Sequence, residues 1–98
     1  IPKALERAGL SLDDMDLIEV NEAFASQIVA CERELKWERG KLNVHGGAIA
    51  LGHPVGATGG KLIATCLSAL EQRGKELGVV SACIGGGQGV AVVIQRTE

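Results

Sequence analysis

Three stretches of the chain combine apolar spacing and flanking residues that predict helices. The first, residues 2–8, begins with a proline and is followed by a glycine, as short helices often are. The second begins after Asn21, a plausible helix cap, and ends by Gly40. The third, residues 61–73, also precedes a glycine. The apolar stripes of the last two helices comprise Phe24, Ile28, Cys31 and Leu35, and Leu62, Cys66 and Leu70.

Apolar runs between these helices predict strands. Three of them are residues 16–20, 79–83 and 90–95. Residues 42–51 are interpreted as an interrupted strand, because strand-forming residues there surround Gly46 and Gly47. The order helix, strand, helix, strand, helix, strand, strand indicates a layered α/β fold with a mixed sheet. The last two strands, joined by the glycine-rich loop 85–89, are expected to form an antiparallel hairpin.

Length and composition limit the chain to one domain or a piece of one. It has 98 residues, of which 46% are hydrophobic, enough for a modest core. We expect one domain over residues 1–98. Because the chain opens on Ile1 without an initiator methionine and runs directly into a helical pattern, we also expect it to be part of a longer protein.

Charge and cysteine content narrow the partners and the compartment. The net charge is −2, basic residues are scattered among acidic ones, and Phe24 and Trp37 are the only aromatic residues. A nucleic-acid partner is therefore not expected. No apolar run is long enough to span a bilayer, so a membrane partner is not expected either. Three irregularly spaced cysteines argue against a disulfide framework and favour a reducing compartment, the cytoplasm or an organellar matrix.

Three residues with useful chemistry lie at or near the ends of predicted strands. Asn21 follows the first strand, His53 lies in the glycine-rich stretch LGHPVGATGG, and Cys83 precedes GGGQG. Ligands in α/β sheets gather at the carboxyl ends of strands, so these residues are expected to converge. A thiol, an imidazole and backbone N–H groups free of Cβ atoms are the components of an acyl-transfer or enolate-forming site.

Other interpretations fit the spacing less well. A Walker A loop would need glycine where Val55 stands and serine or threonine where Leu62 stands, and the chain has no GxGxxG. A zinc site from His45, His53 and Cys83 has suitable ligand types but lacks the close paired spacing of structural sites, so no metal is expected.

Three segments resemble the C-terminal signatures of the thiolase family. They are NEAF at 21–24, GHPVGATG at 52–59 and CIGGGQG at 83–89, in the family's order and at similar intervals. The resemblance covers essentially the whole chain. It implies a thiolase-like layered fold, comprising most of the C-terminal βαβαβαββ half, with the nucleophile-bearing N-terminal half absent from the domain.

The resemblance also implies a reaction. Thiolases interconvert 3-ketoacyl-CoA and CoA with acetyl-CoA and a shortened acyl-CoA through an acyl-cysteine in the N-terminal half. His53 would activate that nucleophile, and Cys83 would move a proton at the acetyl Cα. A water held by Asn21 would join His53 in one oxyanion hole, and the Gly85 N–H would contribute to the other. The CoA thioester would be substrate, with no further cofactor.

The remaining expectations concern neighbouring residues and partners. Gly52 and Gly86 are expected to contact substrate, and the following proline restricts His53 to an extended backbone. The family usually has asparagine where this chain has His45, which is expected either to alter the site or to serve a structural role. Asn21 could instead be only a helix cap, and Glu22 only a charge in the first helical turn.

Two functional classes remain open. In one, the chain is part of an acyltransferase and is inactive without the rest of its subunit. In the other, it is a non-catalytic thiolase-fold fragment that acts as a packing or oligomerising module. A homo-oligomer is expected. The other two cysteines, Cys31 and Cys66, are expected to be small core residues.

Overall fold

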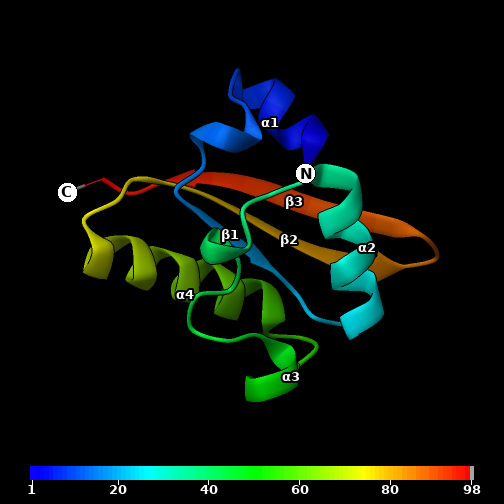
Figure 1. Cartoon of the computed structure of the whole chain (residues 1–98). Helices are drawn as coiled ribbons and strands as arrows, with labels where there is room; N and C mark the ends of the chain where they lie inside the picture. The colour runs from blue at the N-terminus through cyan, green and yellow to red at the C-terminus, as the bar shows by residue number, and fades with distance from the viewer. Residues whose placement is uncertain (98) are drawn as a thin grey trace.

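A computed structural model describes residues 1–97 and shows a three-stranded sheet with helices on both faces (Figure 1). The helices are α1 (Pro2–Ala8), α2 (Ala25–Leu35), α3 (Ala48–Leu51) and α4 (Thr58–Arg73), with 3-10 turns at Leu12–Asp14 and Arg39–Lys41. The strands are β1 (Leu17–Val20), β2 (Leu77–Gly85) and β3 (Gln88–Gln95). Strand β2 is central, parallel to β1 and antiparallel to β3. The predicted α/β class, mixed sheet and closing hairpin are confirmed.

The two faces of the sheet have separate cores. Strand residues alternate between faces, and on one side Ile18 and Val79 pack with residues of α1 and α2 and with Trp37. On the other side Leu17 and Val80 pack against α4. The predicted core roles of two cysteines are confirmed, since Cys66 is fully buried on α4 and Cys31 packs partly buried against the first core.

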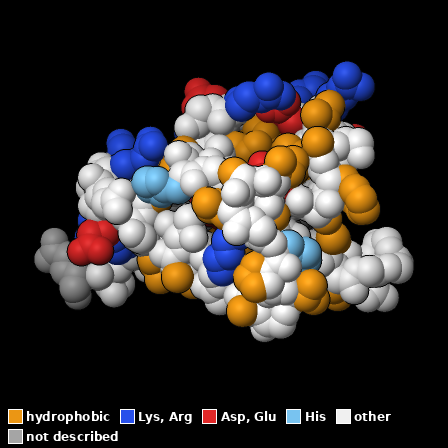
Figure 2. All heavy atoms as spheres, turned by 90° about the horizontal axis from the view of Figure 1, so that it is seen from below, with side chains coloured by type: hydrophobic (Ala, Val, Ile, Leu, Met, Phe, Trp, Pro, Cys, Tyr) orange, Lys and Arg blue, Asp and Glu red, His pale blue; other side chains and the backbone are white. Residues whose placement is uncertain are grey.

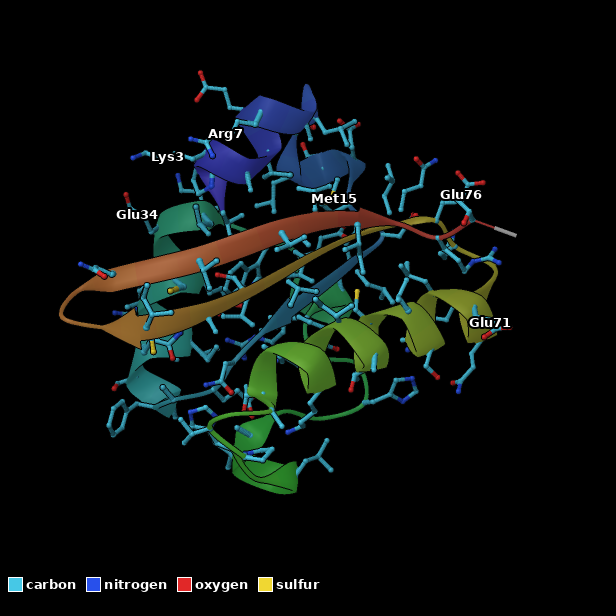
Figure 3. All side chains as sticks on the ribbon, turned by 180° about the vertical axis from the view of Figure 1, so that it is seen from behind. Lys3, Arg7, Met15, Glu34, Glu71 and Glu76 are labelled. Atoms are coloured by element: carbon cyan, nitrogen blue, oxygen red, sulfur yellow. The ribbon has the colours of Figure 1, made fainter. Side chains whose placement is uncertain are left out.

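Figure 3 shows how this layering divides the side chains. Lys3 and Arg7 extend outward from α1, and Glu71 extends from α4 on the other side of the sheet. Met15, by contrast, lies against the sheet and is fully buried. The helices therefore turn their apolar faces inward on both sides, as burial of each face of a sheet requires. No helix within residues 1–97 is long and apolar enough to cross a membrane.

The closing hairpin is longer and tighter than the sequence predicts. The strands pair from Leu77 with Gln95 to Gly85 with Gln88, with an irregularity in register between Cys83 and Gly85. Only two residues, both glycines with positive φ, separate the strands. Because glycine adopts this backbone region at little cost, the run that suggested an open loop forms a tight turn.

The strand predicted at residues 42–51 is wrong. Leu42 forms only an isolated bridge to Ile18, and the segment ends in helix α3. Asn43 at φ 45° and Gly46 at φ 85° turn the backbone out of the extended region between these two points. A chain that turns twice within four residues cannot continue a ladder.

The prediction for the start of α2 is also wrong. Phe24, not Asn21, is the N-cap residue, with an extended backbone, and it is 72% exposed. The rest of the predicted stripe does pack inward. The helix ends before Gly40, because Lys36 adopts the left-handed conformation at φ 56° and Trp37 turns into the core.

Helix α4 positions the glycine-rich loop that precedes it. It begins at Thr58, three residues before the predicted start, and ends as expected at a left-handed Gly74. The chain then returns along β2, so α4 begins beneath the sheet near the end of β1, and the β2–β3 hairpin extends beyond it (Figure 1). All three predicted site segments lie toward this end of the sheet.

Candidate active site

The carboxyl ends of β1 and β2 lie side by side. Val20 and Ser81 are paired across the two parallel strands, and the Asn21 N–H donates to the Ser81 carbonyl at 2.9 Å. Cys83 follows two residues further along β2. The structure therefore brings Asn21 and Cys83 to the edge at which α4 begins, where His53 contacts its first turn.

Asn21 is a buried side chain with unused hydrogen-bonding capacity. It is 2% exposed, and neither Oδ1 nor Nδ2 has a hydrogen-bond partner among the described residues. Leaving a buried polar group unpaired costs about 1–3 kcal/mol. The side chain therefore offers both a donor and an acceptor to a water or ligand at this edge.

The loop that carries His53 is anchored to the start of α4. The His53 Nδ1 lies 2.6 Å from the Thr58 Oγ1, and the same hydroxyl lies 3.0 Å from the Pro54 carbonyl. Lys61 Nζ donates to the Gly52 carbonyl at 2.6 Å. Thr58 is 3% exposed, whereas the imidazole is exposed. The loop thus presents one side of the ring to the helix and leaves the rest accessible.

Cys83 and the glycines after it lie on the exposed tip of the hairpin. The thiol is exposed and lines a hollow of about 210 Å³ together with Gln27 and Leu35 of α2. Gly85 has φ 90° and Gly86 has φ 61°, both in the region that side chains disfavour. Within residues 1–97, no hydrogen bond links Cys83 to His53 or Asn21, so any link between them requires a ligand or water.

Sequence reasoning missed the polar bridge that ties these segments together. The Asn43 side chain pairs with both backbone polar groups of Val20, at 2.9 Å each, and its Nδ2 also reaches Glu22 at 3.4 Å. Glu22 in turn accepts from the Ile49 N–H at 3.1 Å. The expectation that Glu22 serves the first turn of α2 is therefore wrong, because its carboxylate connects the end of β1 to α3.

The same bridge explains one glycine of the NVHGG sequence. A Cβ at Gly47 would collide with the Glu22 carboxyl group. A signal for Asn43 was available in the sequence, since asparagine tolerates the left-handed backbone that it adopts here. Gly47 therefore makes room for a carboxylate, whereas Gly46 turns the backbone.

A buried acid lies on the α4 side of β1. Glu19 is 1% exposed, and its Oε1 has no hydrogen-bond partner among the described residues. Burial, together with the charge of Glu22, raises the Glu19 pKa to about 7, while Lys61 opposes the shift. Burial and the Glu19 charge raise the pKa of the Cys66 thiol to about 12. The sequence contained a signal for Glu19, which is the one acidic residue among the apolar residues of β1.

The structure separates the two histidines. His45 is exposed and lines a shallow hollow with Thr65 and Ser68 along the side of α4, whereas His53 contacts the first residue of that helix. His45 therefore faces a helix and not the His53 loop. Across residues 1–97, no three His, Cys, Asp or Glu side chains are grouped so that they could hold a metal ion.

Apolar side chains gather on the surface beside the His53 loop. Ile49, Leu51 and Val55 are 67%, 57% and 79% exposed. Figure 2, which views the molecule from the α3 side, shows hydrophobic side chains clustered beside one of the two histidines. Clustered exposed apolar residues of this kind mark surfaces that contact another protein segment or a ligand.

The sequence is similar to thiolases throughout its length. It is 59% identical over 97 residues to the mitochondrial 3-ketoacyl-CoA thiolase of Homo sapiens, covering 99% of this chain and 24% of that protein. It is 56% identical over 94 residues to the acetyl-CoA acetyltransferase of Escherichia coli K12, covering 96% and 24%. A peroxisomal 3-ketoacyl-CoA thiolase of Petunia hybrida is 55% identical, with 100% and 22% covered. The chain thus spans about a quarter of the length of these relatives.

The fold gives the same result. The crystal structure of human mitochondrial 3-ketoacyl-CoA thiolase in complex with CoA matches with a TM-score of 0.96 and 58% identity, over 99% of this chain and 25% of that one. Residues 1–96 match the family described as thiolase, C-terminal domain. The resemblance inferred from three short segments is confirmed, and the chain belongs to the thiolase family as a C-terminal domain.

Proposed function

We propose that this chain is the C-terminal part of an acyltransferase subunit that interconverts 3-ketoacyl-CoA and CoA with acyl-CoA and acetyl-CoA. The acylated cysteine belongs to the remainder of the subunit, and residues 1–98 form an incomplete domain that is inactive alone. Membership of the thiolase family supports the reaction class. The coverage of about a quarter of each relative supports the division of the active site between two parts of the subunit.

Two side chains would move protons. His53 would take the proton of the nucleophilic thiol, since an accessible neutral imidazole is a suitable base near neutral pH. Cys83 would then exchange a proton with the acetyl Cα as the enolate forms. Its exposure at the end of β2, beside backbone that carries no Cβ atoms, supports this role.

The other groups would stabilise negative charge on the thioester oxygens. Asn21 would hold a water that acts with His53 in one oxyanion hole, and the Gly85 N–H would donate in the other. Gly52 and Gly86 would let the thioester arm approach the backbone. The observation that carries this proposal is the buried Asn21 amide at the end of β1, whose two side-chain polar atoms are unpaired within residues 1–97.

The substrate class follows from the same assignment. The ligand would be a CoA thioester, with no other cofactor, and one human relative has been solved with CoA bound. The relatives' names include peroxisomal and mitochondrial proteins. For this chain, the compartment remains a prediction of the cytoplasm or an organellar matrix, and the homo-oligomer likewise remains a prediction.

The first test compares thiolysis of acetoacetyl-CoA by this chain and by the same chain extended upstream to a complete subunit. We expect thiolysis only from the extended chain, because the nucleophile lies outside residues 1–98. Turnover by the short chain would contradict the division of the site, since one of its own three cysteines would then have to be acylated.

A non-catalytic packing or oligomerising module is the alternative function. The exposed apolar side chains of Ile49, Leu51 and Val55 favour it, because such a surface suits a protein partner. An extended subunit that carries no second cysteine-bearing half, or that neither acylates nor turns over acetoacetyl-CoA, would favour this alternative over the enzyme.

A further inference from the structure

The contact between His53 and Thr58 restricts where the protons lie. A threonine hydroxyl has one proton to donate and two lone pairs that accept. Thr58 Oγ1 lies 3.0 Å from the Pro54 carbonyl oxygen, which can only accept, and 2.6 Å from His53 Nδ1. If the hydroxyl proton is donated to Pro54, the short contact to the imidazole requires a proton on Nδ1.

The opposite arrangement is less favourable. If Thr58 donated to an unprotonated Nδ1, its oxygen would face the Pro54 oxygen at 3.0 Å with no proton between them. The Thr58 side chain is 3% exposed, so water could relieve that repulsion only poorly. Only the Nδ1–H form of the neutral ring satisfies both contacts at once.

We propose that Thr58 is a positioning residue that holds His53 in the Nδ1-protonated tautomer and so leaves Nε2 as the base. The inference rests on the proposed function for the role of His53 as base. During activation of the nucleophile, the S–H bond breaks and an Nε2–H bond forms. The ring then becomes an imidazolium that keeps its Nδ1–H donated to Thr58, while sulfur becomes a thiolate. As the imidazole ring gains positive charge, the lone pairs of the Thr58 hydroxyl oxygen still accept its Nδ1–H.

The surroundings of Thr58 make this arrangement rigid. Thr58 is the first residue of α4, so its backbone is fixed by the longest helix of the domain. The Pro54 carbonyl also accepts from the Ala57 N–H at 2.7 Å, and Lys61 holds the Gly52 carbonyl at 2.6 Å. The His53 loop is thus held on both sides of the ring, and loss of the Thr58 hydroxyl would not leave the Pro54 carbonyl unpaired.

The test uses Thr58→Val and Thr58→Ser in the complete subunit that contains this chain. Valine keeps the shape but removes the hydroxyl, and serine keeps the hydroxyl. The first readout is the tautomer of His53, read from the two ring ¹⁵N chemical shifts above the imidazole pKa. We expect the Nδ1–H form in the parent and in Thr58→Ser, and a mixture of both forms in Thr58→Val.

The second readout is the rate at which acetoacetyl-CoA acylates the nucleophile. General-base catalysis contributes about 10²–10⁴-fold, and we expect Thr58→Val to lose roughly 10-fold or more of it with KM nearly unchanged. Serine should restore the rate. Thr65→Val, on the same helix but beside His45, is the matched control and should keep both the parent rate and the parent tautomer.

The two readouts separate the two proposals. An Nε2–H tautomer in the parent, or the same tautomer in the parent and in Thr58→Val, would overturn the role of Thr58 whatever the activity. A parent subunit that shows the Nδ1–H form but is not acylated would instead contradict the proposed function. If Thr58→Val fails to fold, Thr58→Ala also removes the hydroxyl and takes its place in both readouts.

Discussion

The body of the sheet and its carboxyl edge differ in how their buried side chains are paired with neighbours. In the body, Ile18 and Val79 are 1% and 0% exposed and pack against other apolar side chains. At the edge, Asn21 is equally buried but its side-chain amide has no hydrogen-bond partner within residues 1–97, and the hairpin glycines adopt positive φ at the surface. The two regions are separated by only a few residues along β1 and β2.

The difference indicates which part of the domain maintains the fold and which part is available for chemistry. Burial of apolar surface stabilises the folded state by about 25 cal/mol per Å². The side chains of the body are almost completely buried and contribute in this way. The edge instead contains groups whose hydrogen-bonding capacity is unused, which lowers stability unless a ligand or water completes them. Variants in the two regions should therefore separate activity from stability.

The largest expected effect is on turnover at the edge. Cys83→Ser in the complete subunit should lower kcat by about 10²–10⁴-fold with little change in KM, because it removes a proton-transfer group and leaves binding contacts in place. Steady-state thiolysis kinetics measure both constants. Cys31→Ser, on the inner face of α2, is the matched control and should turn over normally. Near-parent kcat in Cys83→Ser would remove that residue from the mechanism.

The next largest effect is on stability in the body. Leu70 is fully buried against the sheet, so Leu70→Ala should lower the free energy of unfolding by about 2–5 kcal/mol through lost burial and a residual cavity. Leu67, on the same helix but 37% exposed, provides the control, and Leu67→Ala should cost less than about 1 kcal/mol. Urea unfolding of both variants measures the difference. Equal losses would contradict the assignment of the α4 core.

The smallest expected effect is on the pH dependence of unfolding, through Glu19 in β1, which lies between the body and the edge. Glu19 has a folded-state pKa of about 7 against an ordinary value of 4.5. Below pH 4.5 it is protonated in both states and has no ionisation penalty. Between pH 4.5 and 7 the unfolded chain ionises first, so the free energy of unfolding falls as pH rises, and the full penalty is present above pH 7.

Glu19→Gln should therefore stabilise the protein more at pH 8 than at pH 5. One pKa unit corresponds to about 1.4 kcal/mol, so we expect a difference on the order of 1–3 kcal/mol between the two pH values. Urea unfolding at both values measures it. Glu71→Gln, which removes an exposed carboxylate on α4, is the matched control for the loss of one negative charge. An equal change at both pH values would contradict the raised pKa of Glu19.

Local patterns predicted much of the body. The apolar run before Asn21 predicted strand β1. The helix at residues 2–8 and the glycine that ends α4 follow from residues that favour helix ends. The failures lie where tertiary contacts override local preference. Residues 42–51 have the composition of a strand, but the packing of Gly47 against Glu22 and the turn at Asn43 direct the chain into α3.

The candidate site was predicted in part for a similar reason. Asn21, His53 and Cys83 were identifiable because they adjoin strand ends or glycine runs, and the rule for parallel strands indicated that they converge. Thr58 carried no comparable signal, and the signal of Asn43 concerned its backbone conformation and not its side-chain contacts. Thr58 matters through its contact with Pro54, which lies one helical turn earlier in the chain. Asn43 matters through its contact with Val20, which is distant in the sequence.

The sequence by itself determined the class of the fold, the family and the identity of the groups available for chemistry, because these depend on residue type and order. The tertiary structure decided which of those groups are buried, paired or free. Asn21 became an unpaired amide and not a helix cap because α2 begins only at Ala25. His53 acquired a fixed hydrogen-bond partner because α4 begins early, at Thr58. Burial and pairing are properties of neighbours in space, which local spacing does not specify.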